Sequence, residues 1–86
     1  MDHFNVIKFV LMTEKSIQNI EKENKLVFIV NRKATKKQIS DAVRSAFNTA
    51  TASVRTSIDQ KGRKKAFVRF AKAGEAGDIA VRLGII

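Results

Sequence analysis

Four segments of the chain carry the dense apolar pattern of short β-strands. They are residues 4–11, 25–31, 50–58 and 64–71. The second segment, KLVFIVN, is apolar on both alternating faces, which is typical of a central strand covered on both sides. The third is weaker, because alanine and serine pack poorly on a pleated surface. In the last segment Ala66, Val68 and Phe70 share one face and Phe67 lies on the other.

The intervals between these strands carry helix signals. We expect the Thr13 hydroxyl to cap the start of a short helix and Asn24 to end it in a left-handed conformation. Thr35 and Gln38 have the spacing of a capping box at the start of a second, clearer helix. Its apolar stripe follows the helical period and consists of Ile39, Ala42, Val43, Ala46 and Phe47.

The rest of the pattern completes the predicted fold. Residues 59–63 form a hairpin loop, and residues 75–83 form a last helix in which Asp78 pairs with Arg82. The order of elements is therefore β-α-β-α-β-β-α. It predicts an α+β fold, an α/β/α sandwich around a four-stranded, mainly antiparallel sheet. Because 86 residues suffice for one domain and not for two, we expect residues 1–86 to form a single domain.

Charge is distributed unevenly along this pattern. The chain has a net charge of +9, from 17 Lys and Arg against eight Asp and Glu. Residues 1–31 hold four of each sign, so the whole excess lies in residues 32–86. The like charges of residues 32–86 repel one another in the folded domain. This repulsion indicates a polyanionic partner, either a nucleic acid or an anionic membrane surface. We favour nucleic acid, because membrane binding needs a basic helix with a free apolar face and the best helix here needs its apolar face for the core.

Two basic clusters are candidate sites. Arg32, Lys33, Lys36 and Lys37 lie where the central strand leads into the second helix. Cations are disfavoured near the positive end of a helix, and a bound phosphate would reverse that cost. The second cluster, in and after the hairpin loop, consists of Lys61, Arg63, Lys64 and Lys65. The alternatives are a solvated charge run that keeps the domain soluble, or edge lysines that discourage aggregation.

Other side chains give weaker signals. Arg55 and Arg69 lie inside expected strands, where each faces either RNA or water; we include Arg55 in the predicted RNA-binding set. The aromatic residues Phe28, Phe47, Phe67 and Phe70 fall at core positions of the pattern, and no segment resembles an RNA-stacking motif of the RNP type.

Catalytic and metal chemistry have little support in the sequence. The chain lacks cysteine, and its single histidine, His3, lies near the N-terminus, so no nucleophilic triad, metal-ligand set or cofactor site is expected. We therefore predict no enzyme activity. The N-terminus lacks the pattern of a signal peptide, and no apolar run is long enough for membrane insertion, so we expect a cytosolic protein.

Several motifs now resemble one family. Thr13-Glu14-Lys15-Ser16 after an apolar strand is similar to the TEK-S signature of the universal large-subunit ribosomal protein L twenty-three family. The similarity continues in order over nearly the whole chain. It includes residues 23–28, 34–39, 42–43, 46–48, Val54, Thr56, Gly62 and residues 64–68. The closing residues, from Ile79 to Gly84, resemble archaeal members, and the short hairpin also favours an archaeal type.

The resemblance implies a structural role in the ribosome of the cytoplasm. Members of this family bind large-subunit ribosomal RNA near the polypeptide exit tunnel, contact neighbouring ribosomal proteins and are monomeric within the ribosome. They also offer a docking surface to the signal recognition particle and to nascent-chain chaperones. Carried over by motif, the side chains that face RNA are Lys15, Lys36, Lys37, Thr56, Lys64 and Lys65. Glu14 would belong to the outward docking surface.

This sequence departs from the family pattern in two places. Val10 stands where members usually have proline, and residues 48–53, NTATAS, replace an alternation of valine and lysine. We therefore expect no RNA contacts of the usual kind from residues 49–53. A basic protein-interaction module, or an RNA-binding protein outside the ribosome, remains the alternative to the ribosomal function.

Overall fold

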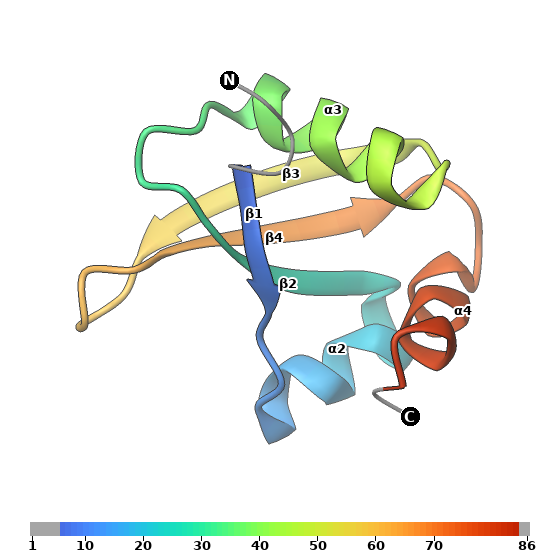
Figure 1. Ribbon diagram of the computed structural model, residues 1–86. Coiled ribbons are helices and arrows are strands. Elements are labelled where there is room, and N and C mark those ends of the chain that lie inside the picture. The colour runs from blue at the N-terminus through green and yellow to red at the C-terminus, as the bar shows by residue number, and fades with distance from the viewer. Residues whose placement is uncertain (1–5, 85–86) are drawn as a thin grey trace.

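A computed structural model describes residues 6–84 and contains the predicted elements in the predicted order (Figure 1). They are β1 (Ile7–Val10), α2 (Glu14–Glu23), β2 (Lys25–Val30), α3 (Lys36–Phe47), β3 (Thr51–Ile58), β4 (Lys64–Phe70) and α4 (Glu75–Arg82). Residues 4 and 5 of the first expected strand, and His3, lie outside the described residues. The α+β fold predicted from the sequence is confirmed.

The sheet has the strand order β1-β2-β4-β3, and every pairing among the described strands is antiparallel. The inner position of β2 explains its apolar sequence: its five residues from Leu26 to Val30 are all buried. β1 pairs with one edge of β2, with a register shift between Ile7 and Phe9. β3 lies at the opposite edge of the sheet and pairs with β4 through the hairpin.

The main core lies between one face of the sheet and the helices α3 and α4. Phe28 and Val68 from the sheet meet Ile39 of α3 and Ile79 of α4, and all four side chains are fully buried. The ring of Phe47 stacks on Phe28, with 5.9 Å between the ring centroids. Ala46, expected in the same apolar stripe, is exposed, because in this last turn only the longer Phe47 side chain reaches the sheet.

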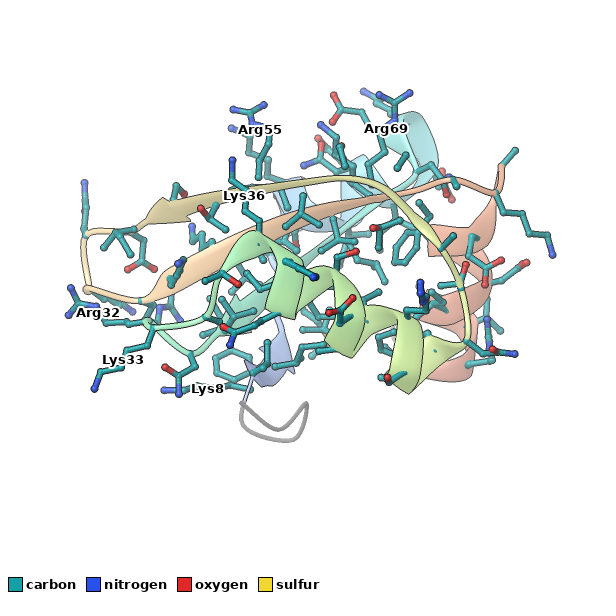
Figure 2. All side chains as sticks on the ribbon, turned by 90° about the horizontal axis from the view of Figure 1, so that it is seen from above. Lys8, Arg32, Lys33, Lys36, Arg55 and Arg69 are labelled. Carbon is teal, nitrogen blue, oxygen red and sulfur yellow. The ribbon has the colours of Figure 1, made fainter. Side chains whose placement is uncertain are left out.

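The other face of the sheet is covered only in part. Val27 and Ile29 of β2 point to this face and are buried, and residues of α2 lie close to Val27 and Phe67. Figure 2 shows α3 on one side of the strands and the side chains of Arg55 and Arg69 pointing away on the other side. The predicted α/β/α sandwich is therefore present, with α2 as a small second layer. We call the part of this face formed by Arg55, Lys65, Phe67 and Arg69 the open sheet face.

Short-range signals set the ends of α2 and α3: the caps at Thr13 and Thr35 and the end at Asn24 are as predicted, and the end at Asn48 was not predicted. Thr13 and Thr35 cap their helices, and each accepts a hydrogen bond from the backbone N–H three residues later. Asn24 and Asn48 follow α2 and α3 in the left-handed conformation, at φ of 55° and 54°. Asparagine tolerates this conformation better than most residues, so both helices stop there.

The Asn24 side chain also joins three parts of the fold. Its amide nitrogen donates to the carbonyl oxygens of Phe70 (3.1 Å) and Lys72 (2.8 Å). Its side-chain oxygen accepts from the backbone N–H of Ala76 at 2.9 Å. Because Gly74, at the start of α4, has no side chain to cap this helix, Asn24 caps it from a distant part of the chain.

The ion pair expected within α4 is formed by a different acid. Arg82 contacts Glu75 at 3.0 Å rather than Asp78. Glu75 is buried and Asp78 is exposed. A buried carboxylate gains more from a cation than an exposed one, because water screens the exposed charge. The i, i+4 spacing that predicted the Asp78–Arg82 pair does not show which of the two acids is buried.

We predict that Asn24→Gly lowers the free energy of unfolding by about 2 kcal/mol, because three hydrogen bonds are lost while glycine retains the backbone conformation. The control is Asn48→Gly, which changes the same residue type at nearly the same φ. The Asn48 side chain is exposed and forms no hydrogen bond with any residue from 6 to 84, so its loss should have little effect. Urea denaturation of both variants measures the difference, and equal losses would contradict the capping role.

Candidate nucleic-acid interface

The first turn of α3 has an unusual charge pattern. It contains Lys36 and Lys37 and no acidic residue. By contrast, α2 begins with Glu14 and α4 with Glu75 and Asp78, as the helix dipole favours. The first backbone N–H groups of a helix have no carbonyl partner within it. The start of α3 therefore combines exposed ammonium groups with free amide donors, a combination suited to an anion.

The two basic clusters predicted from the sequence meet at one end of the molecule. The ammonium group of Lys64 donates to the backbone oxygen of Ala34 at 2.6 Å and so joins the start of β4 to the loop before α3. The guanidinium of Arg32 lies over Gly62, 4.0 Å from the place that a Cβ would occupy. In Figure 1 the hairpin loop and the loop between β2 and α3 project at the same end of the molecule. We call this the basic end; it consists of Arg32, Lys33, Lys61, Arg63 and Lys64.

Two of these cations also have structural contacts. The Arg63 side chain donates to the Asp59 carboxylate at 2.8 Å, and the Lys64 ammonium is bound at Ala34 as described. The other cations of the basic end, Arg32, Lys33 and Lys61, are exposed. In Figure 2 Arg32 and Lys33 lie together at the lower left, whereas Lys36 lies higher. The surface therefore has fixed cations near its centre and exposed cations around them.

Asp59 organises the hairpin loop. One of its carboxylate oxygens accepts from the backbone N–H groups of Lys61 and Arg63, both at 2.9 Å. Burial raises the pKa of Asp59, but the hydrogen bonds from Arg63 and Lys61 and the charge of Arg63 outweigh it, so the pKa is lowered overall. Asp59, the single acid of this loop, is thus ionised and hydrogen-bonded within the loop. The outward-facing charged groups of the loop are therefore basic.

The open sheet face carries cations around an aromatic ring. Arg55 lies directly opposite Phe67 in the pairing of β3 with β4, and Lys65 and Arg69 flank Phe67 along β4. Both Arg55 and Arg69 are exposed and point away from the core (Figure 2). Phe67 was predicted to lie in the core. This prediction is wrong, because Phe67 points away from α3 and α4 and is only partly buried.

Two acidic side chains, Glu21 and Glu23, line a groove together with Arg69 at one end of this face, and an ion pair is formed by Glu23. Glu23 is the last residue of α2, and Lys25 is the first residue of β2. The Glu23 carboxylate accepts a hydrogen bond from the Lys25 ammonium at 2.9 Å. This hydrogen bond and the charge of Lys25 lower the pKa of Glu23, and the charges of Arg69 and Arg55 add to the effect. Glu23 therefore stays ionised and neutralises only one of the cations at this end of the face.

The remaining predicted residues lie in different places. Lys15 is exposed in the first turn of α2 and lines a small pocket together with Lys65, so these two lysines lie near each other. Glu14 precedes Lys15 and is also exposed. Thr56 pairs with Ala66, whose side chain belongs to the core, so Thr56 points to the face opposite Arg55. The structure gathers cations at two places, the basic end and the open sheet face (Figure 2), and Thr56 belongs to neither.

Sequence reasoning placed Phe67 in the core and left Arg69 out of the predicted RNA-binding set, although both lie on this surface. The signal was present in the alternation of β4, which places both opposite Ala66, Val68 and Phe70. It was incomplete because the sequence does not say how much of that face a helix covers. Among residues 6–84 no group of three or more possible metal ligands comes together, and no helix of this range is long and apolar enough to cross a membrane.

The fold and this surface together define a small basic α+β domain with cations gathered at one end and on one sheet face. The family model described as "Ribosomal protein L23" matches residues 5–80. Curated relatives named "Large ribosomal subunit protein uL23" are 47% identical in Methanococcus vannielii, 47% in Methanococcus maripaludis strain C6 and 42% in Methanococcus aeolicus. Each match covers 85 residues, 99% of this chain and 99% of the relative.

The chain therefore belongs to the ribosomal protein L23 family. The resemblance inferred from the TEK-S and later motifs is confirmed, and so is its archaeal type, since these relatives are archaeal proteins.

We predict that Lys64→Met lowers the free energy of unfolding by about 1–2 kcal/mol, because it removes a hydrogen bond from a charged donor to Ala34. Lys65→Met is the matched control, since the Lys65 side chain forms no hydrogen bond or ion pair within residues 6–84. It should change stability by less than ~0.5 kcal/mol. Thermal unfolding of the two variants tests this, and an equal effect would show that Lys64 has no special structural contact.

The pH dependence of the hairpin loop follows from Asp59. Since folding lowers this pKa from an ordinary value of 3.8, the contribution to stability is complete above that value and is lost as the pH falls through the lower folded value. We expect the amide NMR signals of Lys61 and Arg63 to titrate together below pH 3.8, and not to titrate in Asp59→Asn. A midpoint at or above 3.8 would contradict the hydrogen-bonded geometry.

Proposed function

We propose that this large-subunit ribosomal protein binds ribosomal RNA near the polypeptide exit tunnel through its basic end, the start of α3 and the open sheet face. The residues assigned to RNA contact are Lys15, Arg32, Lys33, Lys36, Lys37, Arg55, Thr56, Lys61, Arg63, Lys64 and Lys65. Arg69 joins them, because it is exposed beside Phe67. Residues 49–53 are not assigned contacts: they are small or uncharged, and the Thr51 hydroxyl is hydrogen-bonded to Ser40 at 2.7 Å.

The observation that carries this proposal is the meeting of cations from separate segments of the chain. Residues 32–37 and 61–65 lie far apart in sequence, yet the Lys64 contact with Ala34 fixes them side by side. A solvated charge run gains nothing from such an arrangement, because like charges that approach each other repel. The regularly spaced negative charges of a phosphate backbone would offset this repulsion, which explains why the cations lie together.

The mechanism is neutralisation of phosphates and recognition of RNA shape. The deep groove of an RNA duplex hides its base edges from side chains, so a basic surface contacts mainly phosphates and sugar hydroxyls. Each phosphate contact releases counterions, so affinity should fall steeply with salt. The role is structural, with no catalytic step, and the protein acts as a single domain and a monomer in the ribosome of the cytoplasm.

The side of the protein around Glu14 suits contacts with proteins rather than RNA. Glu14 is exposed, and the nearby side chains of Phe9, Met12 and Ile17 are apolar and exposed by 49%, 63% and 38%. The first 31 residues carry no net charge. We assign this side to docking of the signal recognition particle or of nascent-chain chaperones, and to contacts with neighbouring ribosomal proteins.

The proposal is tested by binding of the purified protein to protein-free fragments of large-subunit ribosomal RNA across a salt series, with tRNA as competitor. Tight binding to one fragment that survives tRNA is the expected result. Equal binding to all fragments, lost to tRNA, would contradict a specific ribosomal site. Binding to an acidic protein that persists after RNA removal would instead support a basic protein-interaction module.

Lys36→Glu combined with Lys37→Glu should abolish specific RNA binding and leave the fold intact. Both side chains are exposed, and glutamate in the first turn of a helix is favoured by the dipole, so unfolding is not the reason for the loss. For the comparison we choose the single variants Lys36→Glu, Lys37→Glu and Lys22→Glu. Lys22 is an exposed lysine in the last turn of α2, and its reversal should reduce affinity far less. Unchanged affinity in the double variant would remove the start of α3 from the RNA site.

A further inference from the structure

A small pocket lies between the first half of α2 and the sheet. Its volume is about 120 Å³, too small for a drug-sized ligand, and it is partly open to solvent. Leu11, Val27 and Phe67 supply apolar surface to it. The polar lining comes from Lys15 and Lys65 and from three small side chains, which are Thr13, Ser16 and Asn19.

Phe67 is the unusual member of this lining. Its cross-strand neighbours are Val27, which is buried, and Arg55, which is exposed. The ring lies outside the main core and is only partly buried. A partly exposed aromatic ring between apolar and cationic neighbours offers a surface on which another planar ring can stack.

Some polar side chains of the pocket are hydrogen-bonded within the protein, and others are not. The Ser16 hydroxyl is within hydrogen-bond distance of the carbonyl oxygens of Leu11 (2.8 Å) and Thr13 (2.9 Å) and accepts from the Thr13 N–H (2.8 Å), so it holds the wall in place. Within residues 6–84, the side chains of Lys15, Asn19 and Lys65 form no hydrogen bond or ion pair. Two cations and one carboxamide are therefore available to a ligand.

The absence of acidic side chains from its lining distinguishes this pocket from two other hollows formed by the described residues. A wider groove near the end of α2 is lined by Glu21 and Glu23, and a third, at the hairpin, is lined by Asp59. The lining of the small pocket contains two lysines and no carboxylate. A ligand that combines a flat apolar ring with a negative charge complements it best.

We propose that this pocket receives a single unstacked base of the bound RNA. The base stacks on Phe67, the amide of Asn19 bonds the base edge, and Lys15 and Lys65 neutralise the adjoining phosphates. This inference rests on the proposed RNA-binding function and adds a specific contact to it. Bases in a duplex remain stacked on each other, so the pocket selects a bulge or loop whose base is free to turn outward.

The test compares two identical substitutions on the RNA fragment that the wild-type protein selects. Phe67→Leu should weaken binding at least about fivefold, because stacking on the ring is lost while an apolar side chain is kept. Phe9→Leu is the control: Phe9 is paired with Ile29 of the same sheet and is 49% exposed, but it does not line the pocket. The salt dependence should stay the same in Phe67→Leu, since no charge is removed, whereas Lys15→Met and Lys65→Met should each reduce its slope by about one.

The matching change in the RNA identifies the base. Each unpaired nucleotide of the fragment is replaced in turn by an abasic one, and one position should weaken wild-type binding about as much as Phe67→Leu does. At that position the abasic change should have little further effect on Phe67→Leu, because both changes remove the same contact. Thermal unfolding of Phe67→Leu shows whether the fold is retained.

The outcomes separate the two proposals. Selective wild-type binding with equal affinities of Phe67→Leu and Phe9→Leu, or with no abasic position coupled to Phe67, would overturn the pocket and leave the RNA-binding function. Failure of the wild-type protein to prefer any fragment over tRNA would overturn the function and the pocket together. If Phe67→Leu unfolds, the abasic scan with Lys15→Met and Asn19→Ala decides in the same way, and no coupled position would again overturn the pocket.

Discussion

Burial of β2 on both faces is the constraint on which the rest of the structure depends. The five residues from Leu26 to Val30 are each no more than 3% exposed. A strand in this position needs hydrogen-bonding neighbours on both edges and apolar cover on both sides. β1 and β4 supply the edges, α3 and α4 cover one face, and α2 covers part of the other. The strand order and the sandwich thus follow from the requirements of one six-residue strand and its neighbours.

The same constraint determines where the charge can lie. The apolar faces of three helices are used to cover β2 and β4, so lysine and arginine are left for the loops at the strand ends and for sheet surface that no helix covers. β3 is an edge strand of mainly small and polar residues, and its Arg55, together with Arg69 of β4, is exposed on sheet surface that no helix covers (Figure 2). The basic surface is therefore a consequence of a small core: an 86-residue chain has too few helices to cover both sheet faces completely.

The features that the sequence predicts well are those formed by residues close together in the chain. The caps at Thr13 and Thr35 and the left-handed end at Asn24 depend on three or four neighbouring residues, and all three have the predicted form. The features that it does not predict join distant segments: the Asn24 contact with Ala76, and the Lys64 contact with Ala34. The exposure of Phe67 belongs with them, since it depends on the size of α2 and not on the alternation in β4. The basic clusters were evident from composition, but their meeting at one end depends on tertiary contacts.

The start of α3 shows how the fold tolerates an unfavourable local feature at a small cost in stability. All three described helices have a basic residue in the last turn, but α3 alone has no acidic residue in its first turn, which contains Lys36 and Lys37. Each misplaced cation costs a few tenths of a kcal/mol up to about 1 kcal/mol, small beside the ~5–15 kcal/mol by which a domain is stable. The capping box at Thr35 and the burial of Ile39, Ala42 and Val43 hold the helix in place despite this cost. A departure from local preference that the core can sustain is the pattern expected at a functional site, where the missing partner comes from another molecule. If the proposed RNA contact is made here, the helix that provides the cations and free amides is already ordered, so binding need not also order it.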